Sequence, residues 1–372
     1  MPDRAGPAEG QWRQRAREFA ESVLVPLRAS IDREDRFPED LTERVARAGF
    51  LGVGLPERWG GEGGDTRCVA AVLEELSRAS AAVATLVSVH ISVCAQPIDR
   101  WGTDAQKEEF LRPLAAGRWL GAFALTEPGA GSDAAGILSR YRRRPDGFVL
   151  NGSKMFITNG ASADVLLTFA AAVEDPHAGR ISAFLLRKGT PGFTAPERLD
   201  KLGLRGSETN GLHFDEVLLP RTALLGDEGR GLSLALGTLT AGRIGIAACA
   251  LGVAQAAYEE VERAVSKGGR EWGRTTLARS YTRLTAARRL VEHAAVLKDQ
   301  GEDYALSASA AKLACAEAAT WIAERSVDVV GPSATLADSR AGQLLRDARV
   351  FPIVEGTTEV QEMILGRALA GG

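Results

Sequence analysis

Apolar residues recur at helical spacing through most of residues 1–118. From Gln11 to about Asp32 they stand three or four positions apart, which predicts a helix interrupted at Pro26. The same spacing predicts a second helix over Pro38–Ala48, ended by Gly49. Two further stretches complete this part: Thr66–Val93, predicted as one or two buried helices, and Asp104–Ala115.

Short apolar runs separated by turn residues replace this pattern near Trp119 and predict strands. Gly147–Thr158 is predicted to be a hairpin, because Asn151-Gly152 tolerates the positive φ angles of a type I′ turn. Three more runs predict strands of the same sheet system: Val165–Ala171, Ile181–Leu186 and Leu212–Leu219.

Helical patterns return after the glycines of 226–231 and are longer. Each of three stretches predicts one helix: Leu232–Val265, Thr275–Asp299 and Ala305–Val330; Leu344–Leu369 includes a short final helix. Because helices and strands occupy separate blocks, the sequence predicts an α+β, mainly helical fold. The blocks divide the chain into an N-terminal helical domain at 1–118, a middle β domain at 119–225 and a C-terminal helical domain at 226–372.

Composition narrows the class of protein. The 372 residues, 45% of them hydrophobic, suffice for a sizeable core, and a net charge of −3 argues against sequence-blind nucleic-acid binding. The apolar stretch Ala81–Ala95 is shorter than the roughly 20 residues of a membrane helix, and Met1–Gly10 lacks the apolar core of a signal peptide. Four cysteines without a CxxC pair indicate reduced thiols, no zinc-type metal site and a cytoplasmic location: Cys68, Cys94, Cys249 and Cys315.

Two segments of the β-rich part carry residues suited to ligand binding. Phe123–Asp133 runs from a strand into a Gly-rich turn, whose backbone N–H groups and hydroxyls suit phosphates or the polar edge of an aromatic ring system. An ordinary strand-to-loop turn is the alternative. In Lys154–Gly160, alternation places Phe156 and Thr158 on one face, an aromatic plane beside a hydroxyl. A strand with a core phenylalanine is the alternative there.

Two charged residues stand out in the C-terminal part. Arg243 is a lone cation in an apolar helix, so it needs an anionic or carbonyl partner, either structural or a ligand. Glu355 follows three apolar residues, and a carboxylate in apolar surroundings has the raised pKa that a general base acting on a carbon acid requires. Gly356 lets its backbone approach a ligand closely. A glutamate at a helix start is the structural alternative for Glu355.

Taken together, these segments resemble the acyl-CoA dehydrogenase family, most closely its short-chain and branched-chain members. The resemblance covers almost the whole chain and rests on five motifs in register: Leu125–Asp133, Phe156–Gly160, Gly242–Ala248, Arg346–Arg349 and Glu355–Thr358. It implies an N-terminal helical domain, a middle β-barrel or sandwich and a C-terminal four-helix bundle, with FAD between them.

The resemblance also implies a role for each motif residue. Glu355 would take the α-proton of an acyl-CoA thioester, its backbone N–H would polarise the thioester carbonyl, and the β-hydrogen would pass as hydride to flavin N5, giving the trans-2-enoyl-CoA. Gly242 occupies the position where some relatives carry an alternative base, which leaves Glu355 as the candidate. Substrate contacts are implied for Ser132, Arg243 and Gly356. Cofactor contacts are implied for Phe123, Leu125, Thr126, Gly131, Ser132, Phe156, Ile157, Thr158, Thr357, Thr358 and Glu359.

The chain departs from the family pattern at three places. The Gly268–Leu277 segment is several residues short, so Arg270 is expected to substitute poorly for the arginine that reaches a neighbouring subunit's FAD. Asp328–Pro332 replaces a second element that contacts the neighbour. Thr240 stands where many relatives place an aspartate that contacts the pantetheine arm. FAD would then be held mainly within one chain, or the dimer contact would differ, or binding would be weak.

Two alternatives to an acyl-CoA dehydrogenase follow from these departures. One is a biosynthetic desaturase or oxidase that acts on an acyl group bound to a carrier protein, and the other is a non-catalytic family member. The partners expected from the resemblance are an acyl-CoA or acyl-carrier-protein thioester, an electron-transfer flavoprotein or another acceptor, and further copies of the chain in a homodimer or homotetramer. Nucleic acid and membrane are not expected.

Overall fold

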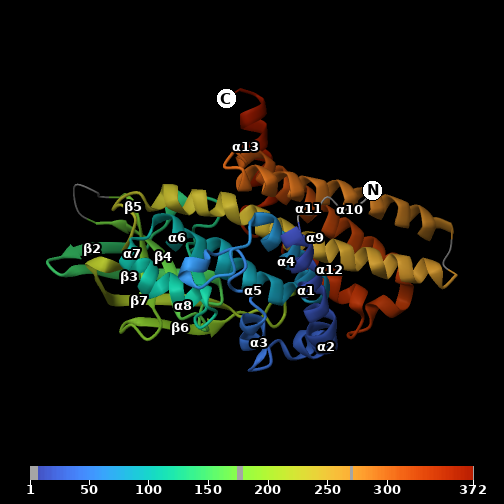
Figure 1. Ribbon diagram of the computed structural model, residues 1–372, viewed down its shortest axis with the longest axis horizontal. Helices are drawn as coiled ribbons and strands as arrows, with labels where there is room; N and C mark the ends of the chain where they lie inside the picture. The colour runs from blue at the N-terminus through green and yellow to red at the C-terminus, as the bar shows by residue number, and fades with distance from the viewer. Residues whose placement is uncertain (1–6, 174–178, 269–270, 372) are drawn as a thin grey trace.

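The computed structural model describes residues 7–173, 179–268 and 271–371, in which a helical part, a β-sheet and a group of long helices follow one another (Figure 1). Pro26 does not break the helical run: a π-helical turn at Ala20–Leu24 leads directly into α2, which contains Pro26. The N-terminal helices are α1 (Pro7–Phe19), α2 (Val25–Glu34), α3 (Leu41–Arg47), α4 (Thr66–Ala79), α5 (Ala81–Ser88), α6 (Gln96–Trp101), α7 (Asp104–Gln106) and α8 (Arg112–Ala115).

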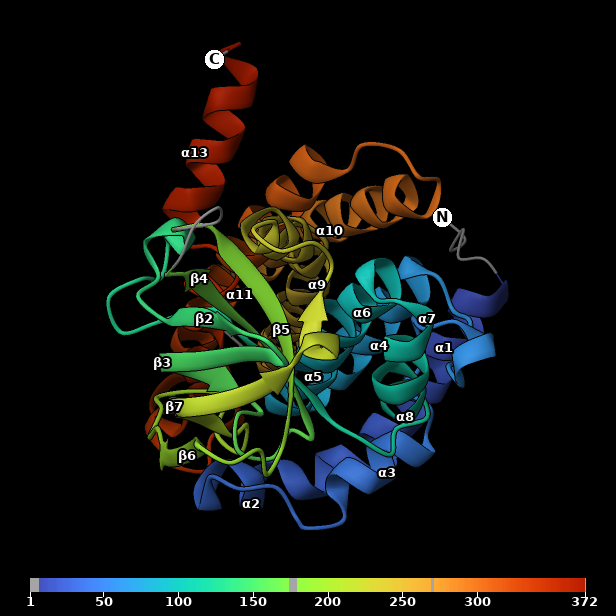
Figure 2. The same ribbon diagram turned by 90° about the vertical axis from the view of Figure 1, so that its left-hand side faces the viewer.

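The middle of the chain forms one eight-stranded sheet in the order β6-β7-β3-β2-β4-β5-β8, with β1 paired to β4 in parallel. Phe148 of β3 and Phe184 of β5 are not on adjacent strands, yet their ring centroids lie 5.1 Å apart, so the sheet curls around an apolar interior (Figure 2). The strands are β1 (Gly121–Ala124), β2 (Arg140–Arg144), β3 (Gly147–Thr158), β4 (Val165–Ala172), β5 (Ile181–Arg187), β6 (Phe193–Arg198), β7 (Thr209–Pro220) and β8 (Leu224–Leu225).

The hairpin predicted within 147–158 is wrong, because this segment is the single strand β3. The turn lies before this strand, at Pro145-Asp146, where it joins β2 to β3, and β7 pairs with β3 along its length. Asn151-Gly152 forms a bulge at which this pairing shifts register, and the Asn151 amide oxygen accepts a hydrogen bond from the Glu216 backbone N–H at 2.8 Å. Only glycine fits at 152, because a Cβ there would overlap the Ser139 side chain.

Long helices form the C-terminal part, and α13 projects from the body in both ribbon views (Figures 1 and 2). The helix α9 packs closely on α4: the Ser77 hydroxyl donates to the Cys249 carbonyl at 2.6 Å, and a Cβ at Gly252 would overlap the Glu74 carbonyl. These helices are α9 (Gly231–Ser266), α10 (Glu271–Asp299), α11 (Ala305–Val330), α12 (Arg340–Ala348) and α13 (Thr358–Leu369). The predicted α+β, mainly helical class is confirmed.

Two helical segments are long and apolar enough to span a membrane by length and composition alone: Ala81–Trp101 and Gly231–Ser266. The apolar windows of these segments are 89% and 72% buried inside the protein. Both segments therefore serve as core helices of this fold.

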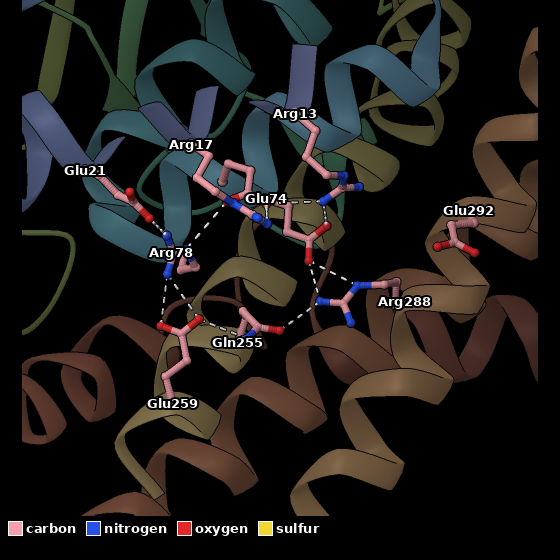
Figure 3. Close-up of a pocket in the computed structure, with 10 residues that line it drawn as sticks. Arg13, Arg17, Glu21, Glu74, Arg78, Gln255, Glu259, Arg288 and Glu292 are labelled. Carbon is pink, nitrogen blue, oxygen red and sulfur yellow. Dashed lines mark hydrogen bonds and ion pairs between the residues drawn. The ribbon is translucent and has the colours of Figure 1, made fainter. Parts of the chain in front are cut away.

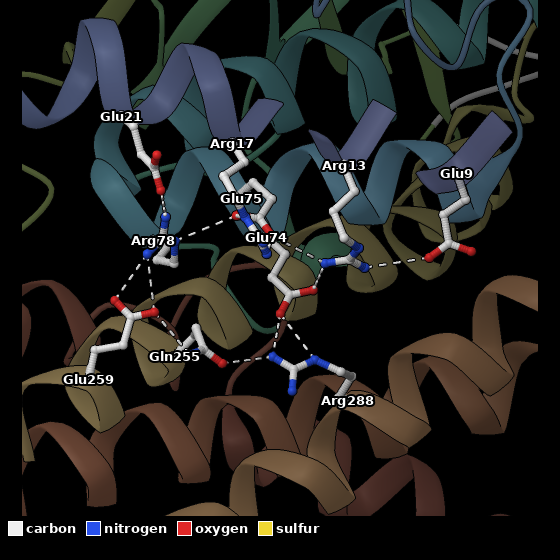
Figure 4. Close-up of polar contacts among 10 residues, drawn as sticks. All are labelled: Glu9, Arg13, Arg17, Glu21, Glu74, Glu75, Arg78, Gln255, Glu259 and Arg288. Carbon is white, nitrogen blue, oxygen red and sulfur yellow. Dashed lines mark hydrogen bonds and ion pairs between the residues drawn. The ribbon is translucent and has the colours of Figure 1, made fainter. Parts of the chain in front are cut away.

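A network of charged side chains joins the N-terminal helices to the C-terminal ones (Figure 4). Glu74 of α4 is buried between Arg13 of α1 at 2.7 Å and Arg288 of α10 at 2.5 Å. Its neighbour Glu75 pairs with Arg17, also at 2.7 Å. The network lines a cavity of about 420 Å³ open to solvent, with Glu74 at its centre (Figure 3). A buried carboxylate of this kind depends on its partners, because the cost of desolvating it is otherwise uncompensated.

We expect Glu74→Gln to lower the free energy of unfolding by about 1–3 kcal/mol, because it removes the buried charge that two half-buried arginines share. Thermal melting or urea titration of the FAD-loaded protein measures the change. Glu292→Gln is the matched control, since Glu292 lines the same cavity but pairs with Arg289 one turn away on the same helix. An equal effect of the two substitutions would contradict the account.

Candidate active site

Glu355 lies in the turn between α12 and α13, two residues before the N-terminal cap of α13. Its backbone is left-handed, with φ 53°, and so is that of Gly356, with φ 94°. A left-handed conformation costs a non-glycine residue about 1–2 kcal/mol. Such residues are kept where the surroundings impose the conformation, most often at functional sites.

The Glu355 carboxylate lies against α9, in surroundings that raise its pKa. Its Oε2 atom is buried and has no hydrogen-bond partner among the described residues. Burial raises the pKa of Glu355 to about 7, although the positive charges of Lys312 and Arg243 act against the rise. On α9, a Cβ at Gly242 would overlap this Oε2 atom and lie 2.9 Å from the Val93 side chain. Gly242 therefore leaves the space that the carboxylate occupies.

Arg243 is buried on α9 next to this carboxylate. Its Nη1 atom donates to the Ser309 hydroxyl of α11 at 3.0 Å, and its Nε atom has no partner within the described part of the chain. Burial lowers the pKa of Arg243, and the charge of Glu355 opposes that effect. Arg243 thus has the Ser309 hydroxyl as a structural partner and, in addition, an N–H group without a partner among the described residues.

Two side chains of the site were missed from the sequence. Lys312 of α11 donates from Nζ to the Gly356 carbonyl at 2.6 Å, and Gln361 of α13 donates from Nε2 to the same oxygen at 3.0 Å. Both residues are buried. Lys312 could have been noticed as a lone charge in the alanine-rich stretch 308–316, whereas nothing in the sequence marks Gln361.

The Gly-rich loop after β1 lies beside β3, because the Met155 N–H donates to the Thr126 carbonyl at 2.9 Å. The next residue, Phe156, has φ 60° and is 66% exposed, so it is not the core phenylalanine that the structural alternative requires. Thr158 is half-buried and Ile157 lies in the apolar interior of the sheet. An exposed aromatic ring and a half-buried hydroxyl thus lie two residues apart at the end of β3, beside this loop.

A buried ion pair fixes this loop. Lys154 Nζ lies 2.8 Å from Glu127 Oε1 and 3.1 Å from the Leu125 carbonyl. The Glu127 carboxylate also accepts the backbone N–H groups of Leu138, at 2.5 Å, and Ser139, at 3.0 Å. Burial alone would raise the pKa of Glu127, but the bonds from Lys154 and Ser139 outweigh burial and hold it below its ordinary value. Residues 125–139 are therefore closed into a loop around one carboxylate.

The other predicted cofactor residues take two kinds of position. Phe123 is half-buried and packs edge-on against Phe169, and Leu125 is buried. Gly131 and Ser132 are exposed, and a Cβ at Gly131 would meet no heavy atom of the described chain within 4 Å. On the C-terminal side, Thr357 caps α13 by accepting the Val360 N–H at 3.3 Å, the Thr358 N–H donates to the Pro352 carbonyl at 2.8 Å, and Glu359 is exposed in the first turn of α13.

The helix before the Glu355 turn, α12, is anchored to α2 and to the segment that contains Leu202 and Leu204. Arg346 of α12 pairs with Asp32 of α2 at 2.5 Å and donates to the Leu202 carbonyl at 3.2 Å. The next residue, Asp347, is buried and accepts the Leu204 N–H at 2.7 Å. Burial raises the pKa of Asp347 to about 6, against the opposing Leu204 bond. The Arg346–Arg349 motif thus fixes the start of the segment that carries Glu355.

Comparison with known proteins gives the same picture over the whole chain. Family models for the N-terminal, middle and C-terminal domains of acyl-CoA dehydrogenase match residues 7–118, 122–217 and 229–370. The chain belongs to the acyl-CoA dehydrogenase family. It is 42% identical to an acyl-CoA dehydrogenase of Bacillus subtilis (strain 168) over 369 residues, 97% of each chain.

Solved structures of relatives have the same fold. Butyryl-CoA dehydrogenase from Megasphaera elsdenii is 36% identical and covers 100% of both chains with a TM-score of 0.96. A prolyl acyl-carrier-protein oxidase is 27% identical, with a TM-score of 0.92 and 98% and 99% of the chains covered. Acyl-CoA dehydrogenases are FAD-dependent oxidoreductases, so the family, the cofactor and the reaction class predicted from the sequence are confirmed.

The three departures from the family pattern are found in the structure as follows. The helix α9 ends at Ser266 and α10 begins at Glu271, and Arg270 lies outside the described residues. Asp328 lies in the last turn of α11 and pairs with Arg325 at 2.8 Å. Thr240 donates its hydroxyl to the Leu236 carbonyl of its own helix at 2.9 Å.

We expect Gly242→Ala to slow reduction of the bound flavin by acyl-CoA about 100-fold, because displacing a catalytic group by about 1 Å costs that much. The added methyl group must push aside either the Glu355 carboxylate or Val93. Anaerobic stopped-flow absorbance measures the rate.

The matched control is Gly237→Ala on the same helix. A Cβ at Gly237 would lie 3.6 Å from the Trp101 ring, an ordinary contact, and alanine favours the helix. This variant should reduce at the parent's rate. If both substitutions had the same effect, the space at Gly242 would not serve Glu355.

Proposed function

We propose that Glu355 is the base of this acyl-CoA dehydrogenase and that its carboxylate takes the α-proton of the acyl thioester. The observation that carries the proposal is the buried Oε2 atom, which has no hydrogen-bond partner in the described chain and for which Gly242 leaves space. A base works best when its pKa lies near the working pH, and that of Glu355 is about 7. The opposing helix offers no second carboxylate at position 242.

The proposed roles of the other groups follow from their positions. The backbone N–H of Glu355 would donate to the thioester carbonyl, where negative charge develops as the α-proton leaves. Ser132, Arg243 and Gly356 would contact the substrate, and the free Nε–H of Arg243 supports its part. An acyl chain that closes the site excludes water and raises the pKa of Glu355 further.

The residues of the cofactor site fit a flat aromatic ring system with phosphates. Phe156 is exposed in a left-handed conformation near Thr158, and Gly131 and Ser132 are exposed, with no heavy atom of the described chain within 4 Å of a Cβ at Gly131. When bound, FAD supplies the acceptor for the β-hydrogen. The proposed holding residues are Phe123, Leu125, Thr126, Gly131, Ser132, Phe156, Ile157, Thr158, Thr357, Thr358 and Glu359.

A short acyl chain on coenzyme A is the substrate we propose. The likeness to butyryl-CoA dehydrogenase over the full length of both chains supports it. A carrier-protein thioester is the second candidate, because Thr240 turns its hydroxyl to its own helix and the structure of a carrier-protein oxidase is similar at 27% identity. The higher identity of the relatives named acyl-CoA and butyryl-CoA dehydrogenase favours coenzyme A.

The remaining proposals concern the setting of the enzyme. An electron-transfer flavoprotein is the proposed acceptor, a homodimer or homotetramer the assembly, and the cytoplasm the location. The four described cysteines are free and buried, which supports a reducing compartment. Domain boundaries after residues 118 and 225 are supported by the spans of the three family models.

We expect Glu355→Gln to keep the yellow colour of the purified protein and to slow anaerobic bleaching by butyryl-CoA about 10²–10⁴-fold, because the amide cannot accept the α-proton. Absorbance of the bound flavin measures both properties. Glu362→Gln, an exposed glutamate on α13, is the control and should bleach at the parent's rate.

Bleaching of Glu355→Gln at the parent's rate would show that Glu355 is not the base. The same assay, run with matched butyryl-CoA and butyryl-carrier-protein, decides the form of the substrate. A parent enzyme that bleaches only with the carrier-protein thioester would overturn the coenzyme A assignment. A protein that stays colourless with added FAD would remove the catalytic function altogether.

A further inference from the structure

The left-handed turn at Glu355 and Gly356 is held by donors from two different helices. Lys312 of α11 and Gln361 of α13 both donate to the Gly356 carbonyl, at 2.6 and 3.0 Å. Gln361 also lies 3.5 Å from the Glu355 carbonyl. A turn with two consecutive positive φ angles needs such contacts, because the glutamate alone would leave this conformation.

Lys312 is a buried cation, with 1% of its surface exposed. Its Nζ atom binds a neutral carbonyl, so its charge must be balanced by acids nearby. The groups that face it and Glu355 come from three helices: Arg243 and Cys249 of α9, Lys312 itself on α11, and Glu359 of α13. Among these, Glu355 and Glu359 are the acids.

The charges of Lys312 and Glu355 each stabilise the ionised form of the other residue. Burial lowers the pKa of Lys312 to about 8, with Glu355 acting against the fall, so the ammonium form prevails at pH 7. Lys312 in turn opposes the rise that burial imposes on the pKa of Glu355. Without it, Arg243 would be the remaining cation among these groups, and the carboxylate would ionise at a higher pH.

We propose that Lys312 is a positioning residue for the base: its ammonium holds the Gly356 carbonyl, which fixes the turn that aims the Glu355 carboxylate, and supplies the charge against which that carboxylate ionises. The inference rests on the proposed role of Glu355. It assigns to an interior residue of α11 a part in the chemistry at a turn 44 positions later in the chain.

The test is the pH dependence of flavin reduction by butyryl-CoA in the FAD-loaded enzyme. The rate of flavin reduction should fall at low pH as Glu355 becomes protonated. Lys312→Met should raise the pH midpoint of this fall by about one unit, because it removes a positive charge near the Glu355 carboxylate. At pH 6 its rate should therefore fall about tenfold, with affinity for butyryl-CoA unchanged. Lys312→Arg should keep the parent's midpoint. Lys298→Met is the control for loss of a partly buried lysine, since Lys298 lies on α10 and donates to Gln96.

A second readout needs no turnover. Glu355 has a raised pKa when folded, so the parent binds a proton that the unfolded chain lacks between about pH 4.5 and 7, and its burial penalty appears as pH rises through that range. The melting temperature of Glu355→Gln minus that of the unmodified protein should therefore increase with pH and level off near pH 7. In the Lys312→Met background it should level off about one pH unit higher.

Gln361→Met covers the case in which Lys312→Met does not fold. It removes a donor to the same carbonyl without removing a charge, so it should slow reduction while leaving the midpoint in place. The inference would be overturned if the pH midpoint of flavin reduction in Lys312→Met equalled that of the unmodified enzyme, or if Lys312→Arg shifted the midpoint as much as Lys312→Met. A shifted midpoint in Gln361→Met would also overturn it. An error in the proposed role of Glu355 as the base is distinguishable, because butyryl-CoA would then still reduce the flavin bound to Glu355→Gln.

Discussion

The site depends on one constraint: a carboxylate must be buried and unpaired, yet still able to ionise near neutral pH. Burial alone would keep Glu355 protonated, because a charged group loses its hydration in the interior. The structure meets the constraint with two cations at a distance, Lys312 and Arg243, rather than with a direct ion pair. A direct pair would occupy Oε2, the atom that accepts the α-proton in the proposed reaction.

This arrangement requires four helices to meet at one turn. Gly242 of α9 makes room for the carboxylate, Lys312 of α11 and Gln361 of α13 hold the backbone, and α12 brings the chain to the turn. The anchoring of α12 to Asp32 and to the Leu202–Leu204 segment ties the same turn to the N-terminal helices and to the connection between β6 and β7. Parts of the chain that are hundreds of residues apart therefore together determine the position of the Glu355 side chain.

Much of the fold and part of the site could be predicted from the sequence. Helix Ala305–Val330 was predicted with its observed bounds, because its apolar pattern is long and regular. Phe156 and Glu355 could be singled out as candidates because their motifs are local. The hairpin at Asn151-Gly152 was wrong because pairing with β7, a long-range contact, outweighed the local turn preference. Lys312 and Gln361 were missed for the same reason: their shared partner is a backbone carbonyl, which the sequence does not mark.

The most direct test of the central claim separates proton removal from hydride transfer. Acetyl-CoA has an α-carbon but no β-hydrogen, so the base alone can act on it. In D2O, the FAD-loaded enzyme should exchange the α-hydrogens of acetyl-CoA for deuterium, as followed by proton NMR, and Glu355→Gln should abolish this exchange. Exchange at the parent's rate in Glu355→Gln would contradict the assignment of Glu355 as the base.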